Sequence, residues 1–175
     1  MTPAIVFRTV AGLALALCLS SATLAAQQMK EKESSPELDR MKGLVGTWKG
    51  IDSEGKPVNV SYKLVSEGTA LMEALGSEGH AESMVTMYHL DQGLLMLTHY
   101  CSMGNQPRLQ LDKRKGSDST LVFTFRDGTN MKSVDDPHID GLTVIFRDKS
   151  HFAQEWVFKE KGKEEKEKFS YERVE

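Results

Sequence analysis

The fold is decided by strict alternation of apolar and polar side chains in the stretch Val58-Asn59-Val60-Ser61-Tyr62-Lys63-Leu64. Successive side chains of a β-strand point to opposite faces of the sheet, so this pattern is typical of a strand with one buried face. The same period recurs in residues 121–125, 142–146, 152–158 and 169–171. These segments predict an all-β protein.

Turn-forming residues separate the predicted strands. Glycine, aspartate and serine gather at positions 52–55, 67–68, 76–79, 91–93, 116–118, 127–128 and 148–150. This gives about ten short strands at the roughly 8–12-residue spacing of barrels and sandwiches. Because no long helical pattern alternates with the strands, a parallel α/β sheet is disfavoured. We predict an antiparallel up-and-down barrel of about ten strands.

A short helix is expected before the first strand. Ser35, Pro36 and Glu37 give a capping hydroxyl, a proline in the first turn and an acid near the positive helix end. Gly43 and Gly46 limit this helix to one or two turns.

The first 26 residues are typical of a cleavable secretory signal. Arg8 is the only charged side chain before Lys30, and it precedes an apolar run over 10–19 and small residues toward 26. The run is shorter than the about 20 residues that a membrane-spanning helix needs. We therefore expect a periplasmic or secreted protein with a flexible leader over 27–35 and one domain over 36–175.

Charge and cysteine content narrow the function classes. The signal contains one arginine and no acid, so its removal changes the net charge from −3 to −4. A mildly acidic chain without a basic cluster is unlike a nucleic-acid-binding protein. No second apolar run is long enough to span a membrane. Loss of Cys18 with the signal leaves Cys101 alone, which excludes an internal disulfide.

The clearest hairpin joins residues 84–90 to 94–101 through a three-residue loop, 91–93. We expect Leu90 to lie opposite Leu94, which places on one face Val85, Met87, His89, Leu95, Leu97, His99 and Cys101. The other face holds Met84, Thr86, Tyr88, Met96, Thr98 and Tyr100. We predict that the His99/Cys101 face lines the interior. Because neither face is strongly polar, the N-terminal helix, a long loop or a second subunit is expected to cover the outer face.

The stretch Leu44-Val45-Gly46-Thr47-Trp48 carries a resemblance to a known superfamily. This stretch resembles the Gly-x-Trp motif of lipocalin-like (calycin) barrels, in which a short helix precedes the motif and the tryptophan closes the barrel base. The resemblance implies that a basic residue near the end of the last strand lies over Trp48, and Arg173 is in that position. It covers roughly residues 36–174, with a strand number closer to the fatty-acid-binding or nitrobindin type.

The middle of the chain resembles a second group. Residues 87–90, 98–101 and 104–108 look like the corresponding part of uncharacterised exported bacterial proteins of the DUF1579-like group. This likeness implies a fold and a compartment but no known activity.

The densest polar cluster contains His99, Cys101, Asn105, Gln106 and Arg108. A cysteine and a histidine two apart on a strand share a face, and they could act as nucleophile and base or as half of a metal site. We favour the plainer interpretation, in which both fill the barrel interior and the histidine is hydrogen-bonded. The arginine could bind a carboxylate or phosphate, or could be an exposed charge.

The longest irregular segment is predicted over 127–141, where His138 lies among three aspartates. Its length suggests a functional loop over the barrel mouth, where His138 could bind a ligand or a divalent cation. We favour a solvated loop because no recognised metal-ligand spacing is present. The nitrobindin likeness keeps haem among the candidate cofactors, with His151 or His99 as its ligand.

Three functions follow from these observations. The favoured one is an exported barrel that binds an apolar or amphipathic small molecule, with ligand-binding candidates His99, Cys101, Asn105, Gln106, Arg108 and His138. The second is an enzyme that uses His99, Cys101 and Arg108. The third is a structural or interaction protein with a filled barrel, which predicts a stable oligomer, such as a homodimer, and no internal cavity.

Overall fold

The structure is a computed structural model that describes residues 33–77 and 80–174. The signal predicted over 1–26 and residues 27–32 of the leader lie outside the described residues. A short helix is followed by ten strands: α2 (Pro36–Lys42), β1 (Gly46–Ile51), β2 (Pro57–Val65), β3 (Ala70–Ser77), β4 (His80–Asp91), β5 (Leu94–Tyr100), β6 (Gln106–Leu111), β7 (Thr120–Thr129), β8 (His138–Phe146), β9 (His151–Glu160) and β10 (Lys163–Arg173). The 3₁₀ turn η1 (Ser66–Gly68) joins β2 to β3.

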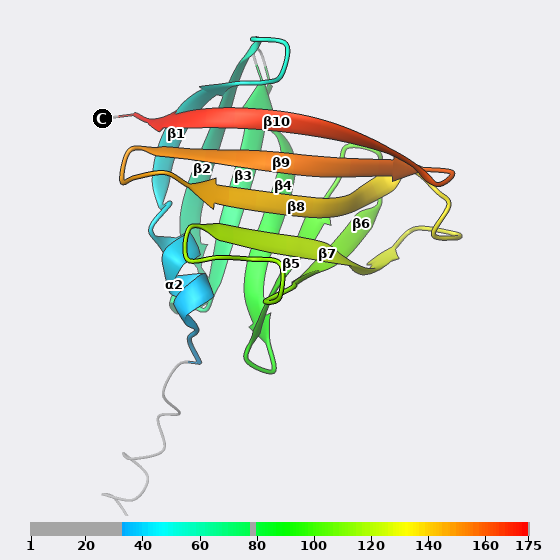
Figure 1. Ribbon diagram of the computed structural model, residues 1–175, viewed down its shortest axis with the longest axis horizontal. Coiled ribbons are helices and arrows are strands. Elements are labelled where there is room, and N and C mark those ends of the chain that lie inside the picture. Colours follow the sequence, from blue (N-terminus) through cyan, green and yellow to red (C-terminus); the bar gives the residue numbers. More distant parts are fainter. Residues whose placement is uncertain (1–32, 78–79, 175) are drawn as a thin grey trace, which may run out of the picture. The chain divides into compact units, whose positions relative to one another are not determined.

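The strands form one closed antiparallel barrel. Each strand pairs with its sequence neighbours, and β1 pairs with β10 to close the sheet, with Trp48 opposite Arg173. Figure 1 shows β8, β9 and β10 side by side on one wall and β2 to β5 on another. Closure leaves the sheet without an open edge. The predicted ten-stranded up-and-down barrel with a short preceding helix is therefore confirmed.

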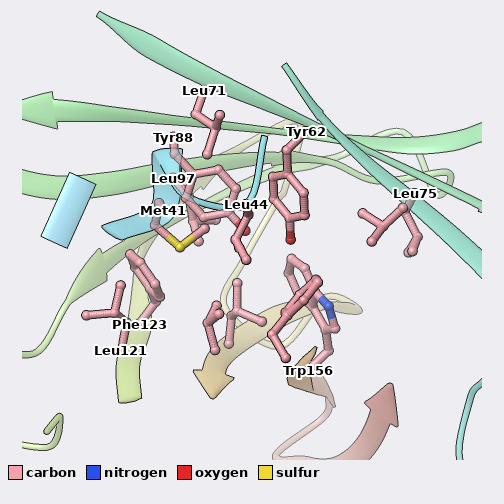
Figure 2. Close-up of a cluster of buried hydrophobic side chains, with 14 of the residues drawn as sticks. Met41, Leu44, Tyr62, Leu71, Leu75, Tyr88, Leu97, Leu121, Phe123 and Trp156 are labelled. Carbon is pink, nitrogen blue, oxygen red and sulfur yellow. The ribbon is translucent and has the colours of Figure 1, made fainter. Parts of the chain in front are cut away.

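Helix α2 closes one end of the barrel (Figure 1). The Ser35 hydroxyl accepts a hydrogen bond from the Leu38 amide at 3.1 Å, which is the N-cap expected from the sequence. Leu38 and Met41 are fully buried. In Figure 2 Met41 lies between Tyr88 on one wall and Phe123 on another, so the helix packs into the barrel. Among the described residues, no helix is both long and apolar enough to cross a membrane.

Arg173 connects the parts of this closed end, and it lies over Trp48 as expected from the sequence. Its guanidinium carbon lies 4.1 Å from the centre of the Trp48 ring. The same guanidinium donates hydrogen bonds to the carbonyls of Gly43 and Val45 at 2.8 Å each and to that of Lys149 at 3.1 Å. One side chain of β10 therefore holds the segment after α2, the β8–β9 turn and the tryptophan of β1 together.

The hairpin between β4 and β5 differs from the prediction by one residue. Its loop has two residues, Gln92 and Gly93, with φ of 52° and 80°, and Leu90 pairs with Leu95 instead of Leu94. Two successive residues with positive φ are typical of the tight hairpin turns that match sheet twist. A slip of one residue reverses the faces of a strand relative to its partner.

As a consequence, the interior face of this hairpin combines one predicted face of β5 with the other predicted face of β4. On β5 the expected residues Leu95, Leu97 and His99 point inward and are buried, whereas on β4 the buried residues are Thr86 and Tyr88. Val85, Met87 and His89, predicted to be inside, alternate with these buried residues and lie on the outer face. Of the three covers expected for the outer face, the helix is contradicted, because α2 packs into the barrel end.

Candidate functional site

A row of polar side chains crosses the barrel interior. The strand register places Tyr62, Glu73, Thr86 and His99 opposite one another on β2, β3, β4 and β5. Each is at most 3% exposed. Gln154, on the facing wall in β9, is 1% exposed and completes what we call the polar layer: Tyr62, Glu73, Thr86, His99 and Gln154.

Local sequence explains how a carboxyl group came to be inside. In β3 the side chains of Leu71, Glu73 and Leu75 share one face, and the two leucines are buried. Because alternate residues of a strand share a face, turning Glu73 toward solvent would also expose both leucines. Core packing of β3 therefore forces the carboxyl group into the interior.

Neutral donors satisfy both oxygens of this carboxyl group. The Tyr88 hydroxyl donates to Oε2 of Glu73 at 2.5 Å, and the Gln154 amide donates to Oε1 at 3.2 Å. The same amide lies 3.1 Å from the Tyr62 hydroxyl. Burial raises the pKa of Glu73, while the hydrogen bonds from Tyr88, Gln154 and Tyr62 oppose that rise.

No cation accompanies Glu73 in the interior. The buried charged or polar residues in the described part of the chain include no lysine or arginine. Buried charges in proteins are ordinarily paired, because desolvation of a lone ion is costly. The polar layer therefore places a carboxyl group among neutral partners, and the raised pKa of Glu73 favours its uncharged form until a cation is bound.

His99 has one satisfied and one free ring nitrogen. Its Nδ1 lies 3.0 Å from the Thr86 hydroxyl, and its ring centre lies 4.9 Å from that of Trp156. Its Nε2 is buried and has no hydrogen-bond partner in the structure. Burial lowers the pKa of His99 to about 4, so the ring is neutral at neutral pH and Nε2 donates or accepts according to the tautomer.

A second interior atom without a partner is the Tyr171 hydroxyl on β10. The Tyr171 ring stacks on Phe152 at 4.7 Å and covers Gly50, where an added Cβ would lie 2.5 Å from the ring. Burial, together with the charge of Glu73, raises the pKa of this phenol well above its ordinary range. Buried polar atoms without partners are uncommon in native proteins, so both atoms call for a physical explanation.

We call the barrel end opposite α2 the mouth. In the described part of the chain it includes residues 52–56, 101–105, 130–137 and 161–162. Asn105 donates to the Pro137 carbonyl and Asn130 to the Gly104 carbonyl, each at 2.7 Å. The Lys161 amide bonds to the Asp135 carbonyl at 3.1 Å. These contacts tie three loops of the mouth together.

A hollow of about 210 Å³ lies on the β9–β10 hairpin at the mouth. It is lined by Phe158, Glu160, Lys161, Lys163 and Glu165. Phe158 shares a face of β9 with Trp156 and Gln154, since alternate residues of a strand point the same way. The hollow therefore lies along the strand face that leads inward to the polar layer.

The predicted loop over 127–141 is shorter than expected, because β7 continues to Thr129 and β8 begins at His138. His138 is 1% exposed, and both of its nitrogens have contacts: Nδ1 with the Asp136 carbonyl at 2.6 Å and Nε2 with Asp140 at 3.3 Å. Its ring also packs on Phe125 at 4.5 Å. His138 thus anchors the start of β8 instead of facing solvent in a loop.

The structure does not bring His99, Cys101 and Arg108 into one site. Arg108 lies on the outer face of β6 and forms a two-pronged ion pair with Asp127, at 2.5 and 2.7 Å. Cys101 is half-buried, just beyond the end of β5. Alternation along β6 points Arg108 away from the interior, where His99 lies.

The remaining candidates have local roles. Asn105 is buried, and its Oδ1 has no hydrogen-bond partner in the structure. Gln106 bonds to the Gly104 carbonyl and to Thr129. His151, considered as a haem ligand, is exposed and lies 3.0 Å from Asp148. Within the described ranges, no group of three or more histidine, cysteine or acidic residues could hold a metal ion.

Sequence reasoning found His99 but missed Glu73 and Gln154. A signal for both was present. Glu73 alternates with Leu71 and Leu75, and Gln154 alternates with Trp156, so each is a polar residue on an otherwise apolar strand face. Such an interruption of an apolar face marks a polar group that the fold must bury.

Comparisons with known proteins assign the chain neither a family nor a function. No family model matches the chain, and no curated protein matches it. A solved redesigned beta barrel is similar in structure at 11% sequence identity, with a TM-score of 0.34, over 77% of this chain and 94% of that one.

Proposed function

We propose that this barrel binds a small apolar or amphipathic molecule, with the polar layer orienting the ligand. The observation that carries the proposal is the His99 Nε2 atom, which lies inside the barrel on a side chain only 2% exposed and lacks a hydrogen-bond partner in the structure. An unsatisfied buried polar atom costs about 1–3 kcal/mol. A ligand that supplies the missing partner would recover that free energy on binding.

The surroundings of His99 suit this role. Ligand sites combine an apolar lining with a few fixed polar groups. Here Trp156 packs against the imidazole, and Thr86 fixes the ring through Nδ1. Helix α2 fills the opposite end, so the ligand is expected to approach through the mouth, past Phe158 and the adjoining hollow.

The contact between Arg173 and Trp48 supports a finer proposal about fold family, namely a lipocalin-like barrel. We also propose that the protein acts in the periplasm or outside the cell after loss of residues 1–26. The support is the charged, apolar and small-residue order of that segment.

A second role, homodimer formation, is favoured by one feature of the outer face. Tyr100 on β5 is 49% exposed and lies opposite Val85 of β4, and the half-buried Met72 and Met87 are neighbours on β3 and β4. Exposed apolar side chains that gather on one face are common at protein interfaces. Light scattering after gel filtration tests this role, and a monomer at high concentration would contradict it.

Ligand binding is tested by titrating the exported protein with N-phenylnaphthylamine, a neutral apolar fluorophore. Saturable fluorescence enhancement is expected. Enhancement without saturation would refute a binding site inside the barrel.

A further inference from the structure

We propose that the ligand carries a positively charged nitrogen on an apolar body, as a primary alkylammonium does. This inference rests on the ligand-binding function proposed above and names the chemical class of that ligand. It stands on three features of the interior: an unpaired carboxyl group, the aromatic rings around it and unused hydrogen-bond acceptors.

The carboxyl group is Glu73. It is 1% exposed, and its partners Tyr88 and Gln154 are neutral donors. No lysine or arginine is buried in the described part of the chain, so nothing inside the barrel balances an ionised Glu73. A bound cation would supply that balance, whereas a bound carboxylate or phosphate would add a second uncompensated negative charge.

Aromatic rings surround this carboxyl group. Tyr88 contacts it directly, Tyr62 lies beside it through the shared Gln154 amide, and Trp156 bonds to Gln154 from the facing wall. Figure 2 shows Tyr62 and Trp156 pointing toward each other across the interior. The negatively polarised faces of aromatic rings attract organic cations, most strongly where water is excluded.

Two unused polar atoms complete the site. When His99 carries its proton on Nδ1 and donates a hydrogen bond to the Thr86 hydroxyl, Nε2 presents a lone pair. The Tyr171 hydroxyl oxygen can also accept a hydrogen bond. An ammonium group has three N–H donors and no acceptor. It therefore suits His99 Nε2 in this tautomer and the Tyr171 hydroxyl oxygen, each of which can accept a hydrogen bond.

The hollow at the mouth does not select by charge. Lys161 and Lys163 lie beside Glu160 and Glu165, so their formal charges cancel. Selection is consequently expected at Glu73, in the interior, and not during approach. This placement makes the proposal testable by a change at one residue.

The test compares octylamine, octanol and octanoate as competitors of bound N-phenylnaphthylamine. Octylamine is expected to displace the probe at a concentration at least about tenfold lower than either of the others, equivalent to about 1.4 kcal/mol. Glu73→Gln keeps the shape of the side chain, removes the charge and turns one of its two acceptor oxygens into a donor, so it should abolish the preference for the amine. Glu155→Gln is the matched control, because Glu155 lies on the outer face of β9 with Lys166 and Lys168.

Equal displacement by octanol and octylamine, or a preference that survives in Glu73→Gln, would overturn the proposal while leaving ligand binding intact. Failure of the probe itself to bind would instead refute the proposed function. If Glu73→Gln does not fold, N-octylacetamide, which lacks the positive charge of octylamine, provides the comparison on the unmodified protein. Equal displacement by these two compounds would again overturn the proposal.

Discussion

Replacing His99 with glutamine removes an ionisable ring from the interior and should reduce the sensitivity of the barrel to acid. Burial lowers the pKa of His99 to about 4 in the folded state, against 6.5 for an exposed histidine. Between these values the unfolded chain binds a proton that the folded chain does not. Falling pH therefore favours unfolding, and the stability present above pH 6.5 is lost as the pH approaches 4.

The size of the effect follows from the shift. A change from 6.5 to about 4, at about 1.36 kcal/mol per pKa unit, gives about 3 kcal/mol. The side chain is only 2% exposed, so solvent screening takes little from this figure. Against a typical total stability of about 5–15 kcal/mol, such a loss is readily measured.

Urea unfolding followed by circular dichroism at about pH 7 and about pH 4 provides the assay. The free energy of unfolding should fall by about 3 kcal/mol more in the unmodified protein than in His99→Gln. Acidic residues such as Glu155 also lose ion pairs in acid, but they do so in both proteins and cancel in the difference. Equal losses in the two proteins would refute the argument that His99 is buried in its neutral form.

Three further substitutions test the parts that hold the barrel together, each measured by urea unfolding. Arg173→Ala removes three hydrogen bonds and the contact with Trp48 and should lower the free energy of unfolding by about 2 kcal/mol. Arg173→Lys should give a stability between those of the unmodified protein and Arg173→Ala. An unchanged free energy of unfolding in Arg173→Ala would contradict the role of Arg173 at the closed end. Met41→Ala should cost about 2–5 kcal/mol because this side chain is fully buried, and a loss below about 1 kcal/mol would mean that α2 is not packed in the barrel. Gly50→Ala should cost about 1–3 kcal/mol because its Cβ would clash with the Ser170 carbonyl oxygen and lie 2.5 Å from the Tyr171 ring; unchanged stability would contradict this close packing of β1 against β10.

The strand pattern could be predicted because its cause is local. Alternation such as that of Val58 to Leu64 needs only neighbouring residues, and the structure contains a strand over Pro57–Val65. The helix start at Ser35 was likewise encoded by its own capping residues. Local propensity and the fold agree in both places, so reasoning from the sequence succeeded there.

The hairpin register was harder to predict, because it depends on backbone angles at the turn. Gln92 adopts a positive φ angle. Asparagine or glycine at this position would indicate such an angle from the sequence, whereas glutamine does not. That one angle shortens the loop, moves Leu90 opposite Leu95 and turns Thr86 and Tyr88 inward. A single unrecognised turn conformation therefore hid Thr86 of the polar layer and Tyr88, the hydrogen-bond partner of Glu73.

The candidate site was predicted only in part, because it is assembled across the barrel. His99 could be placed inside from its apolar neighbours, but its relation to Glu73 and Gln154 depends on which strands close the sheet. Arg108 illustrates the opposite case. It lies close to His99 in sequence, yet β6 places its side chain on the outer face with Asp127.

The central claim, that the polar layer binds a ligand, is tested most directly by observing His99 itself. Long-range proton–nitrogen NMR spectra resolve both ring nitrogens of each histidine, with and without saturating octylamine. We expect the Nε2 resonance of His99 to shift on addition while that of exposed His151 stays in place. An unchanged His99 resonance in protein that has bound the amine would contradict the claim and place the ligand elsewhere.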